Sequence, residues 1–327
     1  MSYKKISKNA PKNCHLCEGM SQTAVVVNKF SHTDYGHLVC RKCGITFDSN
    51  VNDYLSLTLE ADDIRNIKDE DTYRKYFVET SQIASDQGEV YSDFNWENNK
   101  ALKFGVARHV LNAIDRHSVK DGRQSILDLG CGNGFTAVEI AKHNSLYQVT
   151  AVDPSPSVLG VNGIHNIRAI QGTLDSLRFN ADSFDVVVII GNLMLHNNPQ
   201  LTIREARRIL KPQGTLVMDF KNADTFIRRL IRYSALVGMK SVFPRSIVER
   251  SFVNMRFGFR KDYIRTVLRN TGFREIEVYS KPPRLLEFAN KTGLQSGIKG
   301  ILWRLTDQFD LLLDQRAWVQ MIWRNEK

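Results

Sequence analysis

The sequence lacks any apolar run long enough to form a membrane-spanning helix. Its longest mostly apolar stretch, Val186 to Leu195, already includes Gly191 and Asn192, whereas a spanning helix needs about 20 apolar residues. The first residues, Met1 to Cys14, are polar and lysine-rich and lack the apolar segment of a secretory signal. We therefore expect a cytoplasmic protein with no transmembrane segment.

Acidic residues are scarce in the last third of the chain. The 327 residues include 45 Lys and Arg against 35 Asp and Glu, a net charge of +10. Residues 221–327 hold 21 basic and 10 acidic residues, and the remainder is nearly neutral. A basic surface attracts anions such as nucleic acid, anionic lipid or phosphorylated small molecules, but it can also be an ordinary solvated surface. The length suggests about two domains.

Cysteine is also rare, but four of the five cysteines are paired by spacing. Cys14 and Cys17 form one C-x2-C pair, and Cys40 and Cys43 form another. A glycine turn follows each pair, and two such turns direct four thiolates toward one tetrahedral ion, so the spacing predicts a structural zinc site. Disulfides are the alternative interpretation, and the expected cytoplasmic location argues against them.

The segment between the cysteine pairs predicts a hairpin. Residues 24–30 have strand character, residues 34–37 resemble a turn, and residues 38–39 begin the return strand. Residues 1–50 therefore resemble a zinc ribbon. So small a module has little core, and we expect the metal to supply most of its stability. Residues 51–120 follow as a helical linker or lid.

From residue 121 onward, strands and helices alternate. The expected strands are 125–129, 148–152, 167–170, 185–190 and 215–220, and the expected helices are 135–142 and 201–210. This alternation predicts an α/β fold with a doubly wound, mostly parallel, Rossmann-like sheet. A helix at 261–270 and strands at 274–279 and 317–324 would complete seven strands, with an antiparallel last strand.

Acidic and glycine residues gather where the first two strands of this sheet end. Gly130, Gly132 and Gly134 follow the first strand and permit tight turns and close approach of a ligand. Asp153 ends the second strand, where an acid can bind both hydroxyls of a ribose. Asp128 precedes the glycines and suits an ammonium or sulfonium better than a pyrophosphate. The pattern predicts a nucleoside-containing ligand.

Five motifs in order resemble the class I S-adenosylmethionine-dependent methyltransferases. They are residues 126–134 (ILDLGCGNG), 151–155 (AVDPS), 171–175 (QGTLD), 183–187 (SFDVV) and 208–214 (RILKPQG). The resemblance implies a domain over residues 121–327 that binds S-adenosylmethionine. Its weakest parts, about 221–260 and 281–316, are insertions expected to set the acceptor.

The resemblance also assigns roles to individual residues. It places Asp128 near the amino group of the methionine part, Asp153 at the ribose hydroxyls and Asn192 on the methionine and acceptor side. Thr173 and Leu174 would flank the adenine, although many relatives have an Asp in place of Thr173. The remaining residues expected to form the cofactor site are Gly130, Cys131, Gly132, Gly134, Pro154 and Ser155.

His196 follows the fourth strand and is the candidate general base. A base assists methyl transfer to a hydroxyl, whereas a surface or capping role is the alternative for this residue. The base role predicts that His196→Ala lowers turnover and leaves cofactor affinity intact. Cys131 has no partnering base nearby in sequence, so we expect it to fill space rather than to act as a nucleophile.

The combination of a ribbon with this domain resembles methyltransferases of polysaccharide and glycolipid biosynthesis. The resemblance implies a sugar or glycan-precursor acceptor, nucleotide- or lipid-linked, or a related small molecule. Residues 226–242 and 298–313 have apolar faces that suit either packing on the domain or peripheral membrane contact. An RNA methyltransferase, for ribosomal or transfer RNA, and a non-catalytic cofactor-binding module are the alternatives. The sequence does not indicate an oligomeric state.

Overall fold

The structure, a computed structural model, describes ten segments of the chain. They are residues 21–29, 33–40, 46–48, 100–118, 122–174, 177–196, 198–222, 225–226, 257–281 and 318–327. The chain forms two compact units. The larger comprises Tyr54–Asp219, Val267–Glu277 and Met321–Lys327, and the smaller comprises Met1–Asp53, Phe220–Thr266 and Val278–Gln320.

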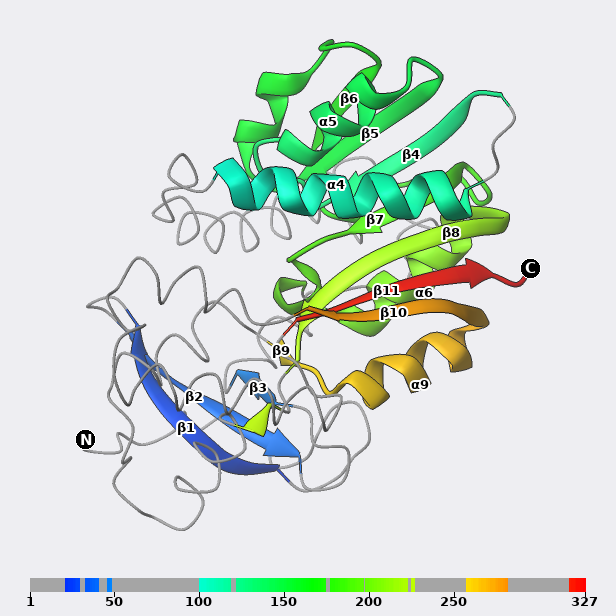
Figure 1. The fold of residues 1–327 in the computed structure, drawn as a ribbon. Helices are drawn as coiled ribbons and strands as arrows, with labels where there is room; N and C mark the ends of the chain where they lie inside the picture. The colour runs from blue at the N-terminus through cyan, green and yellow to red at the C-terminus, as the bar shows by residue number, and fades with distance from the viewer. Residues whose placement is uncertain are drawn as a thin grey trace, which may run out of the picture. The chain divides into compact units, whose positions relative to one another are not determined.

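A seven-stranded sheet dominates the fold, as the sequence predicts (Figure 1). Its strands in spatial order are β10 (Phe273–Lys281), β11 (Trp318–Asn325), β8 (Leu210–Lys221), β7 (Phe184–Ile189), β4 (Gln124–Leu129), β5 (Tyr147–Asp153) and β6 (Ile167–Gln171). The five strands from β8 to β6 are parallel neighbours. Their nearly continuous β-branched and apolar residues suit strands that are covered on both faces.

The last strand runs opposite to its neighbours, which confirms the predicted antiparallel strand. The side chains of Arg324 and Asn325, at the end of β11, donate hydrogen bonds to the carbonyls of Gln213 and Leu210, at the start of β8. The Glu326 N–H likewise reaches the Gly272 carbonyl just before β10. Figure 1 shows β11, in red, lying between β8 and β10.

Four described α-helices accompany the strands. They are α4 (Lys100–His117), α5 (Phe135–His143), α6 (Pro199–Ile209) and α9 (Lys261–Thr271). Helices α4 and α5 pack against each other, with the rings of Phe104 and Phe135 edge to face at 5.1 Å. Within α4, Val110 and Ile114 are buried and Val106 is half-buried. None of the helices in the described segments is long and apolar enough to cross a membrane.

The predicted N-terminal hairpin is present, but its turn lies elsewhere. Strand β1 (Ser21–Lys29) pairs antiparallel with β2 (Thr33–Cys40), and Lys29 stands opposite Thr33. Residues 34–37 pair with residues 25–28 of β1, so the prediction of a turn at residues 34–37 is wrong. Those residues instead pair along β2. A four-stranded sheet is completed by β3 (Thr46–Asp48) and β9 (Phe257–Gly258).

Candidate functional site

The glycine loop joins β4 to α5 and is fixed by backbone hydrogen bonds. The N–H groups of Gly130 and Cys131 both donate to the Val152 carbonyl at the end of β5, at 2.7 and 3.1 Å. Gly130, Gly132 and Gly134 all have positive φ, at 69°, 60° and 78°, which favours glycine at each position. The loop therefore lies across the carboxyl ends of two parallel strands, where α/β folds bind ligands.

The three glycines differ in what surrounds them. A Cβ at Gly130 would overlap the Asn192 side chain, and one at Gly134 would lie 2.5 Å from Val161 Cγ2. A Cβ at Gly132 would meet no atom within 4 Å. Packing thus requires glycine at two positions, whereas at Gly132 the space beside the backbone is open and can admit a ligand.

Asp153 ends β5, and the backbone on both sides holds its carboxylate. Its Oδ2 accepts the Gly132 N–H at 2.7 Å and its Oδ1 accepts the Ser155 N–H at 2.8 Å. Burial raises the pKa of Asp153, and these two N–H groups partly oppose that rise. Each carboxylate oxygen retains further acceptor capacity, so the group can still take the two hydroxyls of a ribose.

Asp128 lies in β4 and is 2% exposed, with no hydrogen-bond partner for its buried Oδ2. Burial, and next the charge of Asp153, raise the pKa of Asp128 to about 7, against an opposing hydrogen bond from the Ala137 backbone. A buried carboxylate oxygen without a partner costs free energy. An ammonium group would supply the missing donor and charge, so this residue fits the amino group of a methionine part.

Asn192 connects the glycine loop to the loop after β7. Its Nδ2 donates to the carbonyls of Leu129 and Gly130, at 2.7 and 3.1 Å, and to that of Ile190. Its Oδ1 lies 2.8 Å from His196 Nε2. Since Nδ2 is the donor in these bonds, Oδ1 is an acceptor and His196 Nε2 carries a proton. Asn192 therefore ties the two loops together.

His196 uses both ring nitrogens in hydrogen bonds within the protein. Its Nδ1 lies 2.9 Å from Thr202 Oγ1, and that hydroxyl also reaches the Asn198 carbonyl at 3.1 Å. A general base needs a lone pair directed at the acceptor proton. This geometry gives His196 a positioning role for Asn192, and the base assignment stays a prediction.

The other predicted cofactor residues lie around the same strand ends. Leu174 is buried and Thr173 is half-buried, both just after β6. The Pro154 carbonyl accepts a hydrogen bond from the Gln171 side-chain amide at 3.1 Å, which joins the loop after β5 to the last residue of β6. Burial, and then the charges of Asp128 and Asp153, raise the pKa of Cys131 above its usual range, so its thiol stays protonated. A protonated thiol is a poor nucleophile, in line with the expected space-filling role.

Asp219 and Thr202 are site residues that the sequence interpretation missed. Asp219, buried near the end of β8, accepts the Gly191 N–H and so shapes the loop that carries Asn192. The available signal was an acidic residue at the carboxyl end of an otherwise apolar strand. Thr202 gave no comparable signal, because its contact with His196 depends on how α6 begins.

The predicted zinc ligands are largely outside the described residues. Cys14, Cys17 and Cys43 fall there, as do most of residues 51–120 and most of the two expected acceptor insertions. Cys40 is described as the last residue of β2. Its pairing places it opposite Ser21, the first residue of β1. In sequence, the first cysteine pair precedes Ser21 and the second begins at Cys40, and these two described residues stand opposite each other.

Comparison with known proteins identifies the central part of the chain. Residues 127–218 match the family described as "Methyltransferase domain". This range includes the glycine loop, Asp153, Asn192 and His196. The part of the chain from β4 to β8 therefore matches a methyltransferase domain.

Curated relatives are similar over the same part of the chain. The 2-methyl-6-phytyl-1,4-hydroquinone methyltransferase 1 of Oryza sativa subsp. japonica is 29% identical over 181 residues, which is 53% of this chain and 48% of the relative. The malonyl-[acyl-carrier protein] O-methyltransferase of Halalkalibacterium halodurans is 30% identical over 131 residues, or 37% of this chain and 48% of the relative. The chain spans about half the length of the curated relatives it matches.

A solved structure has a similar fold. One chain of the complex between the Haloferax volcanii Trm112 methyltransferase activator and a methyltransferase superposes with a TM-score of 0.50. It is 17% identical, and the match covers 75% of this chain and 98% of the other. At this identity, the likeness concerns the fold alone.

Proposed function

We propose that the chain is an S-adenosylmethionine-dependent methyltransferase that acts on a small-molecule acceptor. The observation that carries the proposal is Asp128, a buried carboxylate with an oxygen that lacks a partner, next to the glycine loop and to Asp153. An ammonium and a ribose diol at these two acids are features of that donor. The match of residues 127–218 to the methyltransferase domain family supports the same conclusion.

In this proposal the chain's own residues hold and orient the donor. Asp128 binds the amino group, Asp153 accepts hydrogen bonds from the ribose hydroxyls, and open space at Gly132 admits the ligand against the backbone. Hydrogen bonds of Asn192, with His196 as its partner, hold the loop after β4 close to the loop after β7. When bound, S-adenosylmethionine supplies a sulfonium-activated methyl group, which a nucleophilic acceptor atom takes while the carbon–sulfur electron pair stays on sulfur. Holding the two reactants in line can lower the barrier by about 7–11 kcal/mol.

Within the class of small molecules, we favour a sugar or glycan precursor as the acceptor. The support is the resemblance of a four-cysteine ribbon followed by this domain to methyltransferases of polysaccharide biosynthesis. Names of the relatives point to other small acceptors, a hydroquinone and a malonyl thioester among them. The basic last third would suit an acceptor that carries phosphate.

Structural zinc at Cys14, Cys17, Cys40 and Cys43 is also part of this proposal. The hairpin register supports it, because the first cysteine pair precedes β1 and the second begins at the last residue of β2. The two pairs therefore flank, in sequence, the paired residues Ser21 and Cys40 of one hairpin. Four thiolates would close the coordination shell of the ion, which makes its role structural rather than catalytic.

Calorimetry of donor binding tests the first part of the proposal. We expect the full chain to bind S-adenosylhomocysteine and Asp153→Asn to weaken this binding by roughly 10- to 100-fold, since a hydrogen bond to a charged group contributes about 1.5–3 kcal/mol. Asp115→Asn is the matched control, because Asp115 is an exposed acid that pairs with His143 outside the site. Equal affinities of the wild type and both variants would contradict the donor site.

Methyl transfer into extract of the native host tests the acceptor class. Labelled S-adenosylmethionine and the full chain would be incubated with the extract, and the labelled products would be compared with and without nuclease treatment. Label that survives nuclease and follows the sugar or lipid-linked fraction is the expected result. Label that nuclease releases would instead assign the chain to RNA methylation.

A further inference from the structure

A basic groove lies between α6 and α9, within the larger unit. Its volume is about 540 Å³, within the range of about 300–1,000 Å³ that is usual for small-molecule sites. Arg204, Arg207 and Arg208 line it from α6, at positions that share one helical face, and Lys327 lines it from the chain end. Polar Asn270 and Thr271 line it from the last turn of α9. None of the described residues that line it is acidic.

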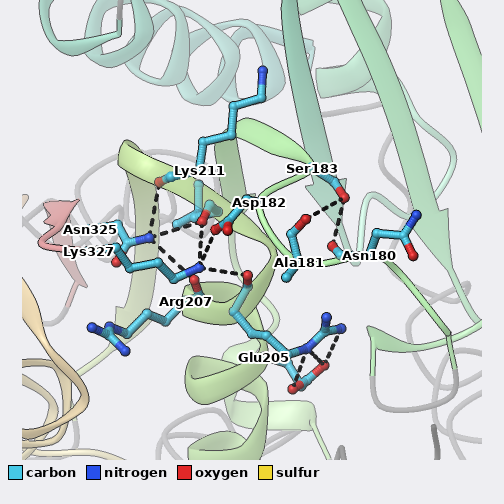
Figure 2. A network of polar contacts seen from close by, with 11 residues as sticks. Asn180, Ala181, Asp182, Ser183, Glu205, Arg207, Lys211, Asn325 and Lys327 are labelled. Carbon is cyan, nitrogen blue, oxygen red and sulfur yellow. Dashed lines mark hydrogen bonds and ion pairs between the residues drawn. The ribbon is translucent and has the colours of Figure 1, made fainter.

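Two of the four basic groups are held and neutralised by other parts of the protein. The Arg208 guanidinium pairs with Glu205, with Nη2 and Oε2 2.8 Å apart, and donates to the Phe179 carbonyl. Lys327 pairs with Asp182 and donates to the carbonyls of Arg208 and Leu210. Figure 2 shows this network, in which Lys327 is anchored beside Lys211 and Asn325. These contacts give the groove fixed walls.

Arg207 differs because its charge has no partner among the described residues. Its Nε is buried without a hydrogen bond. A Cβ at Gly272 would lie 2.8 Å from its Cζ, Nε and Nη2, so the absence of a side chain there lets the guanidinium lie close to the backbone. The guanidinium charge therefore lacks a counter-ion among the described residues, and an anion in the groove would supply one.

The groove is separate from the donor site. Asp182 lies two residues before the start of β7, and Leu210 begins β8, so the end of the groove at Lys327 lies where these strands start. The glycine loop follows the end of β4, which runs parallel to β7. Parallel strands all begin at one end of the sheet and finish at the other end. A ligand near Lys327 would therefore not occupy the space at Gly132.

We propose that the groove between α6 and α9 binds a phosphate group, either as the free ion or as part of a small phosphorylated molecule. Arginine suits this ligand because its planar set of donors matches the oxygens of a phosphate. A phosphate in the groove would supply the counter-charge that Arg207 lacks among the described residues, beside Arg204, which also lines the groove. The inference does not depend on the methyl-transfer function.

Titration of the full chain with inorganic phosphate and glucose 6-phosphate at constant ionic strength tests the proposal. We expect at least one probe to bind, and Arg207→Gln to weaken binding at least tenfold. Arg269→Gln is the matched control, since it removes the same charge from α9 at an exposed residue that pairs with Glu275 outside the groove. It should change affinity by less than twofold.

Two further measurements distinguish phosphate bound in the groove from phosphate bound elsewhere on the protein. The Arg207 Nε–H resonance should shift on addition of phosphate, and saturating S-adenosylhomocysteine should leave phosphate affinity unchanged. Tighter binding of the ester than of the ion would assign the groove to phosphorylated molecules, and the reverse order would assign it to free phosphate. Absence of binding, equal loss in both variants, or displacement by S-adenosylhomocysteine would overturn the proposal. Melting temperatures of the two variants check that both remain folded.

Discussion

The ionisation of Asp128 makes donor binding depend on pH. In the ligand-free protein the pKa of Asp128 is about 7, so the carboxyl is largely neutral below that pH. An ammonium favours the ionised form and lowers this pKa, so binding releases a proton below pH 7. We expect the affinity for S-adenosylhomocysteine to rise by up to about tenfold per pH unit up to pH 7 and then level off. Calorimetry in two buffers of different ionisation enthalpy measures both quantities.

Asp128→Asn is the control for this pH dependence. The amide keeps the shape of the side chain but does not titrate, so its weaker affinity should be flat with pH and its binding should release no proton. A wild-type affinity that is independent of pH between about 5.5 and 8.5 would show that Asp128 does not face the ammonium.

The same residue should affect the stability of the ligand-free protein. Its pKa is raised from the usual 3.8 to about 7. Its contribution to the free energy of unfolding is therefore full below about pH 4 and is lost as the pH rises through 7. We expect Asp128→Asn to gain stability relative to wild type between about pH 5 and pH 8, on the order of 2 kcal/mol, as measured by urea unfolding. A difference that does not change with pH would contradict the shift.

His196 can be tested for both of its assigned roles. His196→Ala should lower turnover and also weaken S-adenosylhomocysteine binding several-fold, because Asn192 loses the partner of its Oδ1. This revises the expectation from sequence that affinity stays intact. His196→Gln can still donate to Asn192, so it should recover affinity but not turnover. Recovered turnover would exclude the base, and unchanged affinity in His196→Ala would exclude the positioning role.

At the scale of single residues, the sequence predicts site residues that belong to a local motif. It misses residues whose contacts depend on side-chain conformation. Strand ends and glycines mark Asp128 and Asp153 within a short stretch of chain, so the sequence predicts both as candidate site residues. The bonds from His196 to Asn192 and Thr202 involve a single turn of 3₁₀-helix and the start of α6. Periodicity does not determine such geometry, which depends on where each helix begins.

At the scale of elements, Asn325 fixes the end of β11 against the start of β8. It is fully buried, and its Nδ2 donates to the carbonyls of Leu210, Lys211 and Arg207 at 3.0, 3.1 and 3.4 Å (Figure 2). Asn325→Ala leaves buried carbonyls with fewer donors and should cost about 2–3 kcal/mol in urea unfolding. Asn325→Asp should cost at least as much, since a carboxylate would face the same carbonyls.

Glu326→Gln is the neighbouring control for Asn325. Glu326 is half exposed and pairs with Arg274 on the surface, so its loss should cost less than about 1 kcal/mol. Equal effects at positions 325 and 326 would mean that the buried amide does not anchor the strand.

Most element bounds follow from periodicity, and the start of β8 is an exception with a non-local cause. Helix α6 was expected to end at Leu210 and the next strand to begin at Thr215. The structure has Leu210 already paired with Phe184, followed by an irregular register before Thr215 pairs with Val186. Lys211 to Gly214 resembles a turn in sequence because it contains proline and glycine. Leu210 pairs with Phe184, which is distant in sequence, and residues 211–214 therefore belong to β8.

At the scale of the whole molecule, the two units differ in what the sequence predicts about them. Residues 128–196, which hold the donor site, lie within the larger unit, where alternating strands and helices define the sheet. The four-stranded sheet of the smaller unit includes β9, far along the chain from β3. No local pattern predicts a pairing between residues so far apart, because a two-residue strand has no detectable period.

The zinc prediction concerns the smaller unit and can be tested on the full chain. We expect one zinc ion per chain by elemental analysis, and the double change Cys40→Ser with Cys43→Ser should remove it. Cys131→Ser is the matched control and should keep the metal, because Cys131 lies in the glycine loop of the larger unit. The double variant should still bind S-adenosylhomocysteine, since Asp128, Asp153 and Asn192 belong to that larger unit.

Alkylation of the same cysteines distinguishes a zinc site from disulfides. Thiolates bound to zinc become reactive toward alkylating reagents when a chelator removes the ion, whereas cysteines in disulfides react only after reduction. Full zinc content with chelator-dependent alkylation is the expected outcome. Absence of zinc, with alkylation that requires a reductant, would replace the metal by disulfides and would also argue against the expected reducing location.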